Sequence, residues 1–77
     1  MNKKIKLIWD FNGEDSFEIA KHHCVHLKEF ADKEKLTFHE IDSIKQSDFK
    51  AIAFITVNDT DMKIYRDALK PHRGELG

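Results

Sequence analysis

Polar and apolar residues alternate along residues 4–11, near the start of the chain. One face of this segment carries Ile5, Leu7, Trp9 and Phe11, and the other carries Lys4, Lys6, Ile8 and Asp10. Because the side chains of a strand point alternately to its two faces, this pattern predicts a half-buried β-strand. Residues 49–57 are apolar on both faces and rich in β-branched and aromatic side chains, which predicts a central strand.

Two stretches with helical signals follow these strands. The first helix is expected to begin near Asp15 or Ser16, since Glu18 follows Asp15 by three residues, as in a capped helix start. It should end near Lys35. Its apolar stripe, with spacings of three and four residues, consists of Phe17, Ala20, Cys24, Leu27 and Ala31. A second helix is predicted between the cap candidates at 58–61 and Pro71, which cannot continue a helix.

The order of elements is then βαββα, with residues 37–42 as a short strand and residues 43–48 as either a loop or a helical turn. The predicted fold class is α+β: a three-stranded mixed sheet of order 1-3-2 with two helices on one face. This arrangement resembles a ferredoxin-like fold that lacks its last strand, a likeness of architecture that carries no function. Residues 1–70 are expected to form a single domain and residues 71–77 a flexible C-terminal tail.

Length and charge narrow the classes of function. The 77 residues suffice for one small domain. The net charge is −1, so no strongly basic surface attracts nucleic acid or an anionic membrane. No apolar run approaches the ~20 residues that span a bilayer, and a single cysteine allows no disulfide within the chain. We therefore expect a cytoplasmic protein with neither a nucleic-acid nor a membrane partner.

The sheet face that no helix covers is the first candidate for a binding surface. With three strands, this face leaves Ile8, Ile52 and Phe54 in water, and strand 1 becomes an edge with unpaired backbone groups. We expect a small protein-interaction module, a homodimer formed through this open face or the edge of strand 1. Alternatively, the three residues are ordinary scattered surface residues, or the tail or residues 43–48 fold over them. RNA binding is not favoured, because the face offers one aromatic ring and no basic surround.

Histidines gather in the run KHHCVH at residues 21–26. His22 and His26 are four residues apart, the spacing at which two imidazoles on one helix face bind Zn²⁺ or a similar divalent ion. The candidate for a third ligand is Glu18, Glu29 or an aspartate. A divalent-metal binder is therefore the alternative function. In the other interpretation the pair is solvated and His23 is a partly packed ring.

No catalytic residue and no cofactor are predicted. Cys24 lies on the apolar stripe, where a small buried side chain is expected, and adjacent helical residues point about 100° apart, so it does not pair with His23. The best place for an enzymatic site is an acidic turn between a strand and a helix N-terminus, which carries Asp10, Asn12, Glu14 and Asp15. It matches neither an EF-hand nor a glycine-rich phosphate loop, and capping explains its charge. A small accessory enzyme using residues 10–15 is the second alternative, with the balance against an enzyme.

Overall fold

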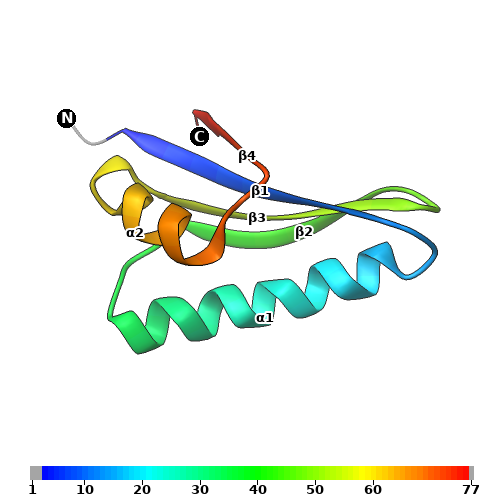
Figure 1. Ribbon diagram of the computed structural model, residues 1–77, viewed down its shortest axis with the longest axis horizontal. Coiled ribbons are helices and arrows are strands. Elements are labelled where there is room, and N and C mark those ends of the chain that lie inside the picture. Colours follow the sequence, from blue (N-terminus) through cyan, green and yellow to red (C-terminus); the bar gives the residue numbers. More distant parts are fainter. Residues whose placement is uncertain (1–2, 77) are drawn as a thin grey trace.

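Both helices of the chain lie on one face of a four-stranded sheet (Figure 1). The computed structural model describes residues 3–76. The elements, in chain order, are β1 (Lys4–Asn12), α1 (Ser16–Glu34), β2 (Glu40–Ser47), β3 (Lys50–Asn58), α2 (Asp59–Leu69) and β4 (Arg73–Leu76). The prediction of a small α+β domain with two helices is confirmed.

The strands lie in the order β2-β3-β1-β4, and each neighbouring pair is antiparallel. β3 lies between β1 and β2, as the two-sided apolar pattern of residues 49–57 predicts. β1 and β3 pair over their whole length, from Lys4 opposite Asn58 to Asn12 opposite Lys50. The prediction of a three-stranded mixed sheet was wrong, because the described sheet has a fourth strand and antiparallel neighbours throughout.

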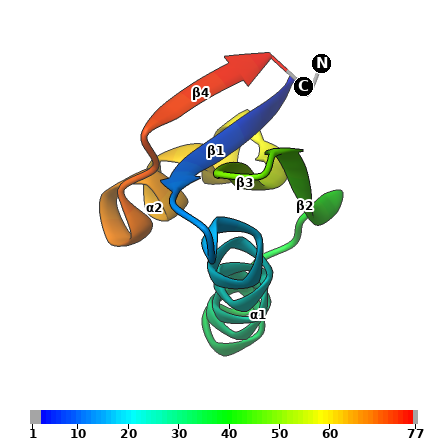
Figure 2. The same ribbon diagram turned by 90° about the vertical axis from the view of Figure 1, so that its right-hand side faces the viewer.

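The fourth strand, β4, comes from residues that were expected in a C-terminal tail. It pairs with β1, from Ile8 opposite Arg73 to Ile5 opposite Leu76, and Figure 2 shows the two strands alongside each other. All four residues of β4 are exposed, so they lack the apolar alternation by which a strand is recognised in a sequence. β1 is therefore an inner strand, and the expected interface along its edge is excluded because β4 already occupies that edge.

β2 is longer than the short strand expected at residues 37–42. It runs through residues 43–47, and its pairing with β3 shifts register between Lys45 and Ser47. Ile41 and Ser43 are partly buried, whereas the residues between and after them are exposed. Because β2 has only one weakly apolar face, its sequence pattern could not show that residues 43–47 continue the strand.

The main core lies between the sheet and the two helices. It is formed by Leu7, Trp9, Leu27, Ala31, Ile55, Val57 and Tyr65. Tyr65 of α2 is fully buried, and its hydroxyl donates a hydrogen bond to the carbonyl oxygen of Thr37 at 3.1 Å. Burial raises the pKa of Tyr65 to about 12, and the nearby charge of Asp61 is the smaller cause. Each large apolar side chain buried in this core stabilises the fold by roughly 1.5–3 kcal/mol.

α1 crosses beneath the sheet with its predicted stripe against the strands. The turn before it contains Gly13, whose φ of 117° is a conformation that favours glycine. Ala20, Leu27 and Ala31 of the stripe are fully buried, and the residue that follows the helix, Lys35, adopts a left-handed conformation. Within residues 3–76, neither helix is long and apolar enough to cross a membrane.

Candidate functional site

The three apolar residues that were expected in water on the open sheet face are buried. Ile8, Ile52 and Phe54 are 2%, 7% and 4% exposed, and they form a small cluster of their own on the face away from the helices. The outer strands flank this cluster, because Asp42 of β2 lies opposite Phe54 and Arg73 of β4 lies opposite Ile8. The expectation of exposure was wrong because it rested on three strands and left out what β4 adds to this face.

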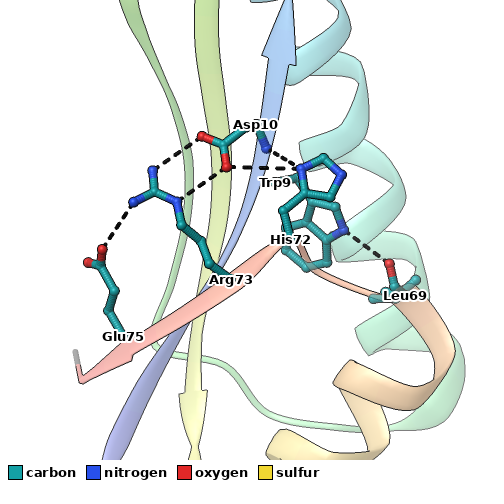
Figure 3. Close-up of polar contacts among 6 residues, drawn as sticks. All are labelled: Trp9, Asp10, Leu69, His72, Arg73 and Glu75. Atoms are coloured by element: carbon teal, nitrogen blue, oxygen red, sulfur yellow. Dashed lines mark hydrogen bonds and ion pairs between the residues drawn. The ribbon is translucent and has the colours of Figure 1, made fainter.

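Charged side chains complete the cover of this cluster. The Nζ of Lys6 lies 4.5 Å from the centroid of the Phe54 ring, within cation–π range. Nε and Nη2 of Arg73 each donate to a carboxylate oxygen of Asp10 at 3.2 Å, and Nη1 donates to Glu75 at 3.2 Å (Figure 3). Long charged side chains can bury their stems against apolar surface while their heads remain in water. Charged side chains, rather than a second layer of structure, therefore close the face.

Asp10, which was singled out as part of an acidic turn, holds the C-terminal segment in place. Its backbone amide donates to Nδ1 of His72 at 2.8 Å, and Nε1 of Trp9 donates to the carbonyl oxygen of Leu69 at 3.0 Å (Figure 3). Together with the fork between Arg73 and Asp10, these bonds tie the end of α2 and the start of β4 to β1. The structure thus gives this carboxylate a partner 63 positions later in the chain, and its geometry is that of a structural ion pair.

His22 and His26 lie against each other on the exposed side of α1. Their Nε2 atoms are 2.9 Å apart, and Nδ1 of His26 lies 3.2 Å from Oε1 of Glu29. Glu18, a candidate for the third ligand, instead pairs with Nζ of Lys21 at 3.0 Å. No group of three His, Cys, Asp or Glu side chains suited to a metal ion occurs within residues 3–76. The structure therefore brings the predicted pair together without a third protein ligand.

His23, next to this pair, points into the protein. Its ring centroid lies 4.7 Å from that of Trp9 and 5.5 Å from that of Phe11. Its Nε2 is buried and has no hydrogen-bond partner among the described residues. Burial lowers the pKa of His23, and the charges of His26 and His72 lower it further. His23 is thus a packed aromatic ring, as the second interpretation of the histidine run predicts.

Cys24 lies on the side of α1 that faces the sheet. It packs against a cluster of small residues, Ala20, Ala51 and Ala53. Burial raises the pKa of its thiol, and a smaller opposite effect comes from a hydrogen bond with Ser43. A thiol that stays protonated is a weak nucleophile and a weak metal ligand, so Cys24 does not join the histidine pair.

The outer edge of β2 is free in the part of the chain that the structure describes. This eight-residue strand pairs with β3 on one side only. Between β2 and α1 lies a hollow of about 380 Å³, lined by Cys24, Val25, Lys28, Phe38 and Ile41. Ile44 in β2 is 45% exposed, and Phe49, in the turn that follows, is 58% exposed. Sequence reasoning missed this surface because residues 43–48 show no clear period, and the isolated Ile44 and Phe49 were its only signals.

Comparison with protein-family models, with curated proteins and with solved structures finds no match for this chain. The candidate sites therefore rest on their residues and geometry alone. Two remain: the free edge of β2 with its exposed Ile44, and the histidine pair on α1.

Proposed function

We propose that the chain is a protein-binding module that pairs with a second copy of itself along β2. The observation that carries this proposal is the eight-residue strand whose outer edge is free among the described residues. The outward N–H and C=O groups of such an edge can pair with another strand. The other edge of the sheet is the four-residue β4, which offers half of this length.

The side chains of β2 favour antiparallel pairing centred on Ile44. Ile44 is cross-strand to Ile52 of the covered cluster, and it is 45% exposed in the single chain. When two copies of Ile44 lie opposite each other, they shield one another from water and join the clusters of both copies into one. This contact removes an apolar side chain from water at about 25 cal/mol for each Å² that becomes buried.

The charges along β2 are compatible with this register. With Ile44 opposite its copy, Ser43 lies opposite Lys45, and Asp42 lies opposite the uncharged Gln46. Like charges that face each other directly would destabilise the pairing, and these positions avoid them. The like-charged Glu40 and Asp48 face each other only beyond the end of β2, because Asp48 lies in the turn that follows it. A twofold axis makes both contacts occur twice, as in most homodimers. The partner is therefore a second copy of this chain, and the product is one continuous sheet.

The mass in solution tests this proposal. We expect the molar mass from light scattering to rise towards twice that of one chain as the concentration is raised. Ile44→Lys places two ammonium groups at the twofold axis and should hold the chain as a monomer. The matched control is Ile64→Lys, because Ile64 of α2 is 47% exposed and lies away from β2. A wild type that stays monomeric, or an Ile44→Lys variant that pairs as well as the wild type, contradicts the proposal.

We also infer that the fold is the complete ferredoxin-like arrangement, not one that lacks its last strand. The element order βαββαβ and the strand order 2-3-1-4 support this inference. This fold has many unrelated functions, so it adds nothing to the assignment of a partner.

A further inference from the structure

We propose that His22 and His26 form a two-imidazole site for a divalent transition-metal ion with right-angled coordination. Among such ions we expect Cu²⁺ to bind most tightly. This site is on the outer side of α1 and does not depend on pairing through β2. Three features of the pair carry the proposal: the separation of the two Nε2 atoms, the contact of His26 with Glu29, and the exposure of the site.

The separation of the Nε2 atoms, which a hydrogen bond between the rings sets in the absence of metal, also fits two ligands at a right angle. With metal–nitrogen bonds of about 2.0–2.1 Å, a right angle at the metal places two nitrogens roughly 2.9 Å apart, whereas a tetrahedral angle places them roughly 3.3 Å apart. The observed distance between His22 and His26 is 2.9 Å. Right angles are those of square-planar and tetragonal sites, which Cu²⁺ and Ni²⁺ prefer. Zn²⁺ prefers a tetrahedron and binds such ligands less tightly than Cu²⁺ does.

Glu29 orients one of the two ligands. Its Oε1 lies 3.2 Å from Nδ1 of His26, so the carboxylate favours the tautomer with the proton on Nδ1 and leaves the lone pair on Nε2. In the absence of metal, Nε2–H of His22 donates to that lone pair. When the ion binds, the proton of His22 moves to its own Nδ1, and both Nε2 lone pairs point at the metal. A carboxylate behind a ligating histidine is the usual second partner of a metal site.

The surroundings leave the remaining coordination positions to water. The side chains of His26 and Glu29 are more than half exposed, so a hydrated ion can reach the site. The neighbouring His23 and Cys24 are turned towards the sheet, and the described residues supply no third ligand. A rigid helix holds the two imidazoles one turn apart, so the two ligands are positioned before the ion binds. We therefore expect one ion per chain, held by two protein nitrogens.

Calorimetry with copper on the full chain without an affinity tag tests the site. We expect one Cu²⁺ per chain for the wild type, and binding at least tenfold weaker for His22→Ala and for His26→Ala. Alanine is the best helix former, so these exposed substitutions keep α1 folded. The control is His39→Gln, since His39 lies outside α1 and is also exposed; it should bind copper as the wild type does.

Two further measurements separate this site from a simple hydrogen bond between imidazoles. The electron paramagnetic resonance spectrum of the copper complex should show coupling to two nitrogens, reduced to one in either alanine variant. Glu29→Gln should weaken binding by 10–100-fold, as is typical for loss of a second-shell partner, while both nitrogens stay bound. Equal copper binding by the wild type and the His22→Ala variant overturns the proposal, as does zinc binding as tight as copper binding.

Discussion

A histidine ring, that of His23, packs against Trp9 and Phe11 and is expected to make the stability of the fold depend on pH. The Nε2 of His23 has no hydrogen-bond partner among the described residues, and a proton added there would place a charge in a largely apolar setting. Burial lowers the pKa of His23 from its ordinary value, and the charges of His26 and His72 act in the same direction. The folded chain therefore binds this proton less readily than the unfolded chain.

The free energy of unfolding is expected to fall as the pH drops through about 6.5, where His23 takes up its proton in the unfolded chain. The loss continues down to the lower pKa of the folded chain and then stops. Denaturant unfolding at a series of pH values measures this slope. His23→Leu should flatten it, whereas the exposed-site control His39→Gln should not. Identical slopes for the wild type and His23→Leu would show that His23 is not the cause.

Tyr65 permits a spectroscopic test of the core, because it is the only tyrosine in the chain. Its pKa is raised to about 12, so its ultraviolet absorbance should change near pH 12 in the folded protein. In denaturant the change should occur near its ordinary value of about 10. Above about pH 10 the unfolded chain loses this proton first, and the free energy of unfolding should decrease. A native midpoint near 10 would mean that the Tyr65 hydroxyl is not buried.

At the scale of elements, β4 shows where prediction from the sequence ends. β1, α1, β3 and α2 are recognisable because each carries a periodic apolar pattern that the core uses. β4 has exposed residues only, and the groups that hold it, such as Asp10, lie more than 60 positions away. Their pairing is a product of the assembled sheet, and no local pattern encodes it.

The candidate sites also divide into those that a local pattern predicts and those that depend on the assembled sheet. The contact between His22 and His26 follows from helix geometry, so a spacing of four was enough to predict it. The burial of Ile8, Ile52 and Phe54 depends on which charged side chains the outer strands place beside them, and this requires the full sheet. The free edge of β2 could not be predicted from the sequence either, because the length of a polar strand depends on the strand with which it pairs.

Arg73→Ala is expected to lower the free energy of unfolding by about 1 kcal/mol, because it removes a forked, charge-assisted contact that holds β4 on β1. Chemical denaturation measures the loss. The matched control is Arg66→Ala, since the side chain of Arg66 makes, among residues 3–76, only a 3.4 Å contact with its neighbour Asp67 on the surface of α2. That variant should change stability by less than about 0.5 kcal/mol. Equal losses in the free energy of unfolding of the two variants would show that the contact between Arg73 and Asp10 does not stabilise the fold.

For the whole molecule, the open face of the sheet and the free edge of β2 are the two surfaces on which the described residues place no further helix or strand. Both helices lie on the same face of the sheet, so among the described residues the other face carries no second layer and the outer edge of β2 has no neighbouring strand. Charged side chains protect the face, whereas β2 keeps outward backbone groups and the exposed Ile44. In the proposed pairing, a second copy would cover these backbone groups and Ile44, and it would extend the apolar cluster of Ile8, Ile52 and Phe54 across the twofold axis.

The most direct test of this pairing is an isotope-filtered nuclear Overhauser experiment on a mixture of ¹³C-labelled and unlabelled chains. Because only contacts between copies give a signal, the pairing along β2 predicts cross-peaks between the methyl groups of Ile44 in one copy and those of Ile44 in the other. Ile64 on α2 should give none. Cross-peaks confined to other surfaces, or their absence at concentrations where the mass is that of two chains, would contradict the account.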